Sequence, residues 1–157
     1  MSKTTQATLA LKRAGVAFAV HLYEYHPDAA RIGLQAAEAI GAAPERVLKT
    51  LMVEVDGKPV CTVIPSDHEL SMKKVAAAFG GKHAEMMKPE AAERLTGFHV
   101  GGISPFGQKR KVPAAIEEAA MAHEQVIING GQRGVMVELA PADALKALGA
   151  KAAALIA

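Results

Sequence analysis

The sequence of 157 residues is poor in the residues on which several classes of protein depend. Its single cysteine, Cys61, excludes an internal disulfide and agrees with a reducing cytosol. It has no tryptophan and few aromatic residues, which makes extensive stacking on nucleic-acid bases an unfavourable interpretation. No apolar run reaches the about 18 residues that span a membrane, and Lys12 and Arg13 interrupt the first apolar stretch. We therefore expect a cytoplasmic protein with no membrane partner.

Metal chemistry has equally little support. Six histidines are scattered along the chain without an H-E-x-x-H motif, and there is no second cysteine to form a metal-binding pair. Cys61 alternates within an apolar stretch, which is typical of a core thiol rather than a nucleophile. We expect no metal and no cofactor, and no covalent catalyst is recognisable. The net charge of +2 is too small to predict nucleic-acid binding by itself.

What the sequence does contain is an even mixture of helix and strand patterns in a length that suits one domain. Asp56-Gly57 joins two β-rich runs and predicts a hairpin over 46–65. Because helices and strands interleave around an antiparallel hairpin, we expect an α+β fold with a mixed sheet rather than a regular βαβ repeat. The other predicted strands are 17–25, 82–88, 124–130 and 135–140, and the predicted helices are 3–14, 34–41, 69–81, 89–97 and 141–149.

Lys49 is the charged residue with the most unusual neighbours. Alternate residues of a strand share a face, so Lys49 lies on the apolar side, with Val47 and Leu51. An unpaired buried ammonium is costly, so the side chain either extends to solvent at the strand end or meets an anion. The second alternative predicts a cation at the edge of a pocket, available to a phosphate or a developing negative charge.

Two glycine-rich segments are candidate binding loops. The first, VGGISPFGQKR at 100–110, approaches a phosphate-binding loop, but Lys109 is one position late and no Ser or Thr follows it. Its Ser104 also misses the nucleophile-elbow spacing, so the pattern alone favours a structural turn. The second, INGGQRG at 128–134, places Arg133 either at an exposed hairpin turn or where it can bind a phosphate or carboxylate.

Four segments, in their order and spacing, resemble the YbaK family of aminoacyl-tRNA deacylases, which is related to the editing domain of bacterial prolyl-tRNA synthetases. They are HLYEYHPD (21–28), RVLKTLMVEVDGK (46–58), TGFHVGGISPFGQKRKVP (96–113) and NGGQRGVMVELAP (129–141). The resemblance covers nearly the whole chain and is greatest for the branch that hydrolyses Cys-tRNA(Pro). It implies one editing domain over 1–157, with a mostly antiparallel, partly barrel-like sheet surrounded by helices.

The resemblance also implies a site. The lysine matching Lys49 is the central functional residue of the family, and Tyr23 matches an aromatic residue at the pocket rim. The last glycine turn, with Asn129, Gly130 and Arg133, faces the same site. The first loop contacts the 3′-terminal adenosine and positions the ester; its residues are Gly101, Gly102, Ile103, Ser104 and Pro105. We expect the acceptor-stem backbone to contact Lys109, Arg110 and Lys111.

The implied reaction is removal of a wrongly attached amino acid from tRNA. A synthetase pocket separates side chains of similar size poorly, so a second site must hydrolyse the wrong product. In the family, the thiol of the misattached cysteine attacks its own ester carbonyl, and some members are classed as lyases. The implied partners are mischarged tRNA(Pro) and prolyl-tRNA synthetase, in a transient complex that selects the tRNA.

Two positions depart from the family pattern. Many relatives begin the last glycine turn with serine, where this chain has Asn129, and some carry a polar or acidic residue at the position of Met136. If the face of Met136 lines the pocket, the pocket is smaller and more apolar. Editing of Ala-tRNA(Pro) or another mischarged tRNA is therefore an alternative. A non-catalytic tRNA- or nucleotide-binding module is an alternative of another class.

Overall fold

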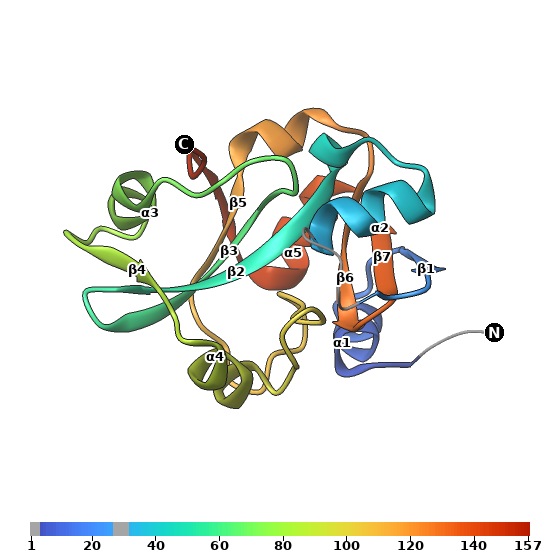
Figure 1. Ribbon diagram of the computed structural model, residues 1–157, viewed down its shortest axis with the longest axis horizontal. Coiled ribbons are helices and arrows are strands. Elements are labelled where there is room, and N and C mark those ends of the chain that lie inside the picture. Colours follow the sequence, from blue (N-terminus) through green and yellow to red (C-terminus); the bar gives the residue numbers. More distant parts are fainter. Residues whose placement is uncertain (1–3, 27–31) are drawn as a thin grey trace.

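The hairpin of β2 (Val47–Val55) and β3 (Lys58–Pro65) forms the centre of the sheet. Asp56 and Gly57 join the two strands with φ angles of 49° and 80°, as the Asp-Gly pair predicts. The computed structural model describes residues 4–26 and 32–157. In this part of the chain, eight strands form one sheet in the order β1-β7-β6-β2-β3-β5-β8, and β4 also pairs with β2 (Figure 1).

The sheet is mixed, and the expected α+β class is confirmed. The β1–β7, β6–β7, β2–β3 and β2–β4 pairs are antiparallel, whereas the β2–β6, β3–β5 and β5–β8 pairs are parallel. The end strands β1 and β8 do not pair with each other, so the sheet is open rather than closed into a barrel. The other strands are β1 (Ala19–Leu22), β4 (Ala84–Met86), β5 (Ala114–Glu117), β6 (Val126–Gln132), β7 (Val135–Leu139) and β8 (Lys151–Ala153).

The first and third helices begin at side-chain caps, and a glycine with positive φ follows the first, fourth and fifth helices. The Thr5 side chain accepts a hydrogen bond from the Thr8 N–H, and Gly15 ends the first helix with φ 72°. Ser71 caps the third helix in the same way, through the Lys74 N–H. The helices are α1 (Gln6–Ala14), α2 (Ile32–Ile40), α3 (Met72–Ala78), α4 (Pro89–Thr96) and α5 (Pro141–Leu148), with short 3₁₀ turns η1 (Pro44–Arg46) and η2 (Glu118–Ala122).

Both faces of β2 are buried. Leu48 and Met52 belong to the largest core cluster, which also includes residues of α1, α4 and α5. Val53 and Val55 point the other way, into a second cluster with Val75 of α3. A central strand covered on both faces can reach a ligand only where its edge is not paired with a neighbouring strand. Such an unpaired edge exists on β2, because β6 and β4 each pair with only part of the strand.

Several elements differ in extent from the sequence predictions. The predicted helix at 69–81 is limited to residues 72–78, and the strand at 17–25 to residues 19–22. The strands β5 and β8 were not predicted, because their alanine-rich sequences carry no strand signal, and neither were the two short 3₁₀ turns. Pro27 and Asp28, at the end of the HLYEYHPD segment, lie outside the described residues. Within the described ranges, no helix has the length and apolar character needed to cross a membrane.

Candidate functional site at a fork in the sheet

The central strand β2 has a complete neighbour on one side and a divided neighbour on the other. The β3 side is paired continuously from Leu48 to Val55. On the opposite side, β6 pairs with Val47 and Leu48 only, and β4 pairs with residues 53–55 only. The two partners diverge between these points, leaving a fork in the sheet whose inner edge is formed by residues 49–52 (Figure 1).

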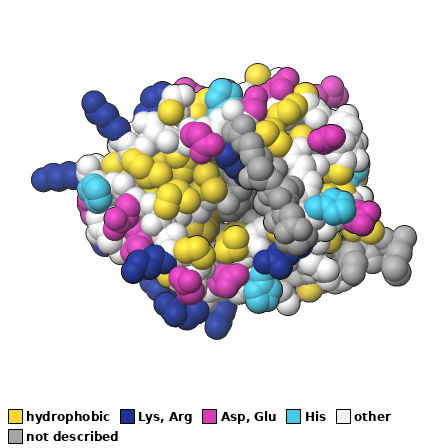
Figure 2. Space-filling model, viewed as in Figure 1, with side chains coloured by type: hydrophobic (Ala, Val, Ile, Leu, Met, Phe, Trp, Pro, Cys, Tyr) yellow, Lys and Arg dark blue, Asp and Glu magenta, His cyan; other side chains and the backbone are white. Residues whose placement is uncertain are grey.

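A cavity of about 490 Å³ opens at this fork. Its volume lies within the range of small-ligand sites, about 300–1,000 Å³. Its walls are mostly apolar, and exposed Met86 and Val100 belong to them. On the same face, apolar side chains gather in the left half of the view, and basic side chains lie along the lower margin (Figure 2).

Among the residues that the structure describes, Lys49 is the one basic side chain in the wall of this cavity. Its Nζ lies 3.6 Å from Glu69 Oε1, and the Lys49 side chain is only 22% exposed whereas that of Glu69 is 71% exposed. The ammonium is therefore held beneath the surface, beside a carboxylate at the rim, rather than extended into solvent. An ammonium in this position can bind an anionic or electron-rich group inside the cavity.

The two glycine-rich loops meet on the opposite wall, and Asn129 joins them. The Asn129 side-chain oxygen accepts a hydrogen bond from the Gly131 N–H at 2.7 Å, and its amide nitrogen donates to the Gly101 carbonyl at 3.4 Å. Thr5 Oγ1 donates to the Gly130 carbonyl at 2.5 Å, which fixes the second loop to the start of α1. Asn129 and Gly101 both line the cavity with Lys49.

Arg133 holds the first glycine loop from outside the cavity. Its Nε donates to the Val100 carbonyl at 2.9 Å, and its guanidinium lies over the Tyr25 ring, 5.5 Å from the centroid. A Cβ on Gly101 would lie 2.6 Å from the Tyr25 hydroxyl, and a Cβ on Gly102 would lie 2.7 Å from the main-chain nitrogen of Arg133. Gly101, with φ 90°, thus packs against Tyr25, and Gly102 packs against the main chain of the second loop.

The cavity includes some of the predicted site residues and not others. Tyr23, Lys49, Gly101, Ile103, Asn129 and Met136 line it. Ser104 is fully buried and its Oγ accepts a hydrogen bond from the Phe106 N–H, so it shapes the loop. Pro105 lines a separate cavity of about 160 Å³ instead. Gly102, Gly130 and Arg133 form the loops behind the wall, and the functional role of every predicted residue stays a prediction.

The three predicted backbone-binding cations separate into two groups. Lys109 and Arg110 line an open groove with Arg94 of α4, because their N–H groups donate to the carbonyls of Thr96 and Leu95. Met87 borders both this groove and the main cavity, so the two adjoin. Lys111 lies beside the separate cavity that Pro105 lines.

Several lining residues were not singled out from the sequence. Three further methionines, Met52, Met86 and Met87, line the cavity with Met136 and provide an adaptable apolar surface. Thr50, Ser66 and Glu69 are the polar residues among those missed. The hairpin register did not contain the signal for Glu69, because it places Ile64 opposite Lys49 and Glu69 lies four residues beyond the end of β3 at Pro65.

Cys61 is a core residue, as its alternation predicts. It is fully buried outside the main cavity, and burial raises the pKa of its thiol to about 12. Among the residues that the structure describes, no three His, Cys, Asp or Glu side chains come close enough to hold a metal ion. Tyr23 lines the cavity, and burial raises the pKa of its phenol.

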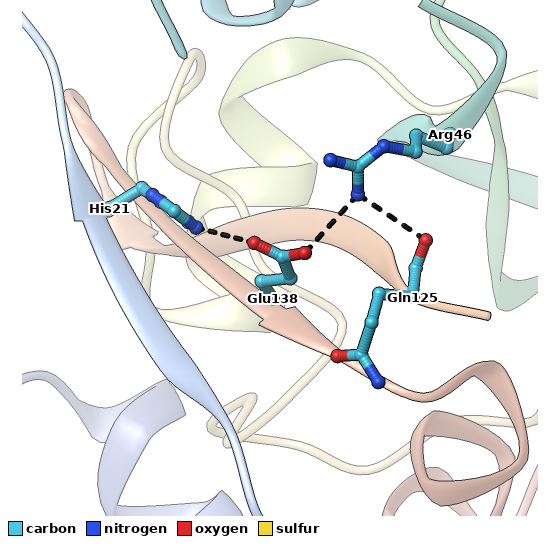
Figure 3. Close-up of polar contacts among 4 residues, drawn as sticks. All are labelled: His21, Arg46, Gln125 and Glu138. Carbon is cyan, nitrogen blue, oxygen red and sulfur yellow. Dashed lines mark hydrogen bonds and ion pairs between the residues drawn. The ribbon is translucent and has the colours of Figure 1, made fainter. Parts of the chain in front are cut away.

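A second polar cluster lies at the outer part of the sheet. One carboxylate oxygen of Glu138 (β7) lies 2.6 Å from Nε2 of His21 (β1), and the other lies 3.3 Å from a guanidinium nitrogen of Arg46 (η1) (Figure 3). Arg46 also donates to the Gln125 carbonyl. The hydrogen bond with His21, and then Arg46, lower the pKa of the Glu138 carboxyl. These contacts hold three separate elements together.

Known proteins share both the sequence and the fold of this chain. The family model described as "Aminoacyl-tRNA editing domain" matches residues 26–147. The chain therefore belongs to the aminoacyl-tRNA editing domain family, and the resemblance seen in the sequence is confirmed.

Individual relatives agree with this assignment. The Enterococcus faecalis protein named "Putative Cys-tRNA(Pro)/Cys-tRNA(Cys) deacylase EbsC" is 42% identical over 107 residues, which cover 67% of this chain and 65% of that protein. Proline--tRNA ligase of Geobacillus thermodenitrificans is 32% identical over 96 residues, which cover 61% of this chain and 16% of the ligase. The match thus spans less than two thirds of either protein.

The fold has a solved counterpart over its full extent. A crystal structure described as that of "a putative trans-editing enzyme for prolyl tRNA synthetase" superimposes with a TM-score of 0.82 and 25% identity. The superposition covers 99% of each chain.

Proposed function

We propose that the protein is a trans-editing deacylase that hydrolyses the ester of mischarged Cys-tRNA(Pro), with Cys-tRNA(Cys) as a further substrate. The observation that carries this proposal is that Lys49 and the two glycine loops border one cavity. Family membership and the name of the Enterococcus faecalis relative support the substrate class.

The cavity has the features that such a substrate requires. The terminal adenosine lies against Gly101 and Ile103, and the small amino acid lies toward the methionines of the apolar wall. Lys49 either holds the terminal nucleotide or lowers the pKa of the substrate thiol. Both roles use the same position of the ammonium between the rim and the glycine loops.

The reaction proceeds with the substrate's own nucleophile. The described residues that line the cavity include no histidine, cysteine or aspartate, and the Ser66 hydroxyl donates to the Pro44 carbonyl. The cysteine sulfur attacks its own ester carbonyl, a C–S bond forms, and the C–O bond to the ribose breaks. The thiol proton goes to the ribose oxygen, and water then opens the cyclic thioester. Positioning and electrostatics supply the catalysis.

The groove beside the cavity extends the site to the rest of the tRNA. Lys109, Arg110 and Arg94 contact phosphates of the acceptor stem without reading the sequence. Lys111, which lies beside another cavity, contributes less. Selection among tRNAs comes from a transient complex with prolyl-tRNA synthetase, which places the protein in the cytoplasm.

A panel of tRNA(Pro) esters tests the function. Cys-, Ser-, Ala- and Pro-tRNA(Pro) are incubated with the protein, with and without the synthetase, and loss of the ester is followed. The seryl ester is the matched control, because it replaces the thiol with a poorer nucleophile of similar size. Rapid loss of the cysteinyl ester alone supports the proposal, and equal rates for Cys and Ser contradict thiol assistance.

The buried methionine in the wall favours one second candidate. Met136 is only 4% exposed and lies opposite Asn129 on the neighbouring strand, so it narrows the cavity from the β7 side. A narrow apolar cavity also suits an alanyl ester. Faster loss of Ala- than of Cys-tRNA(Pro) would establish this alternative, and tight tRNA binding without any ester loss would indicate a non-catalytic module.

A further inference from the structure

Thr50 has a polar side chain that the fold does not use. Its hydroxyl oxygen is buried and has no hydrogen-bond partner among the described residues. A buried hydroxyl without a partner destabilises the folded state, because it loses its bonds to water and gains none. Native proteins contain few such groups, and each calls for an explanation.

The position of Thr50 gives that explanation. It lines the cavity directly beside Lys49, and the residue is only partly buried although its hydroxyl oxygen is fully so. The exposed part of the residue therefore belongs to its other atoms. Rotation by about 120° between staggered conformations exchanges the substituents of Cβ and brings the hydroxyl toward the cavity.

The main-chain N–H and carbonyl groups of Thr50 also face the fork where the cavity opens. The Val47 carbonyl accepts from Ser66 on the β3 side, whereas the Met52 carbonyl accepts from Met87 on the side of the fork. Main-chain groups alternate along an antiparallel strand, so Thr50, like Met52, directs its N–H and carbonyl into the fork. The strand pairings of β6 and β4 do not include Thr50.

We propose that Thr50 is a substrate-binding residue of the deacylase, whose hydroxyl donates a hydrogen bond to the aminoacyl ester while Lys49 acts from the adjacent position. This inference rests on the proposed function. The ester carbonyl gains negative charge during attack, so a donor at this point stabilises the transition state more than the bound substrate.

Thr50→Val tests the role, because valine keeps the shape and removes only the hydroxyl. The matched control is Thr62→Val on β3, where the hydroxyl is also buried but donates to the Leu51 carbonyl at 2.7 Å. We expect Thr50→Val to lower kcat about 10-fold or more and to leave the melting temperature unchanged or higher. Thr62→Val is expected to lower the melting temperature and to keep kcat, and Thr50→Ser should restore most of the activity.

The outcomes separate the inference from the function on which it rests. A wild-type protein that removes no ester from the panel overturns both. A wild-type protein that is active, together with a Thr50→Val variant of equal kcat and KM, overturns only the role of Thr50. If Thr50→Val is unfolded, the Thr50→Ser variant decides, since a large loss of kcat in that folded protein contradicts a role for the hydroxyl alone.

Discussion

Arg46 and Lys49 are cations three residues apart in the sequence, yet their surroundings differ. Arg46 donates to the Glu138 carboxylate and to the Gln125 carbonyl, so its position is fixed from two directions. Lys49 has a contact of 3.6 Å to an exposed carboxylate at the mouth of the cavity. The first arrangement binds parts of the fold to one another, and the second keeps a charge accessible to a ligand.

The difference arises from the pairing of β2. Arg46 precedes the strand and lies beside β7, where the sheet is continuous. Lys49 lies where β6 has left β2 and β4 has not yet joined it. Polar groups that bond to one another, such as Arg46 and Glu138, indicate a structural role. Polar groups that gather at the fork, such as Lys49, indicate a ligand-binding role.

Lys49→Ala should have the largest effect on activity. Loss of the ammonium is expected to lower kcat/KM for the edited ester by about 100-fold or more, as for other groups that stabilise developing charge. Because the ion pair with Glu69 is partly exposed, stability should change by less than about 1 kcal/mol. Deacylation kinetics and urea unfolding measure both quantities. Arg46→Ala is the matched control, and a greater loss of activity there than in Lys49→Ala would reverse the comparison.

Gly101→Ala tests the opposite wall. The residue has φ 90°, and a Cβ would lie 2.6 Å from the Tyr25 hydroxyl. Gly80→Ala is the control, because Gly80 also has positive φ (69°) but open space around it. We expect Gly101→Ala to cost about 1–3 kcal/mol more than the control and to reduce deacylation, measured by unfolding and by kinetics. Equal stability of the two variants would show that the Tyr25 side chain moves aside at little cost.

The cationic groove should have a smaller, salt-dependent effect. Replacing Lys109 and Arg110 by alanine is expected to weaken tRNA binding and to reduce the dependence of log K on log salt by about 0.9 for each lost phosphate contact. Filter binding over a range of salt concentrations measures this slope. Lys111→Ala should change it less, because Lys111 lies beside a different cavity. If both variants show the same dependence of log K on log salt, the groove and Lys111 do not differ in their contact with phosphates.

Glu138→Gln should have the smallest effect, and only on stability. The folded state lowers the pKa of Glu138, so its charged form stabilises the fold above the ordinary glutamate pKa, about 4.3. That contribution is lost as the pH falls through the lower pKa of the folded state. The variant should therefore be less stable than wild type at pH 7, by about 1 kcal/mol or less, and the difference should shrink as the pH falls through the acid range. A constant difference across this range would contradict the assignment.

The sequence predicted the hairpin and the position of Lys49 on an apolar face, because local signals determine both. Asp56-Gly57 selects its turn, and strand alternation places Lys49 on an apolar face. The fork was not predictable in this way, since β6 and β4 come from distant parts of the chain and meet β2 only in the folded state. For the same reason, Asn129 was noted as a departure from the family, but its link between Gly101 and Gly131 was not foreseen.

The fork also determines how readily selectivity can change. The hollow results from the divergence of two backbone segments, so the framework does not depend on the particular side chains that face it. Met86 and Val100, which line the cavity and are 47% and 43% exposed, can therefore be enlarged or reduced to alter what the cavity accepts, at little cost to folding. An architecture of this kind is a natural starting point for redesigning proofreading toward other amino acids.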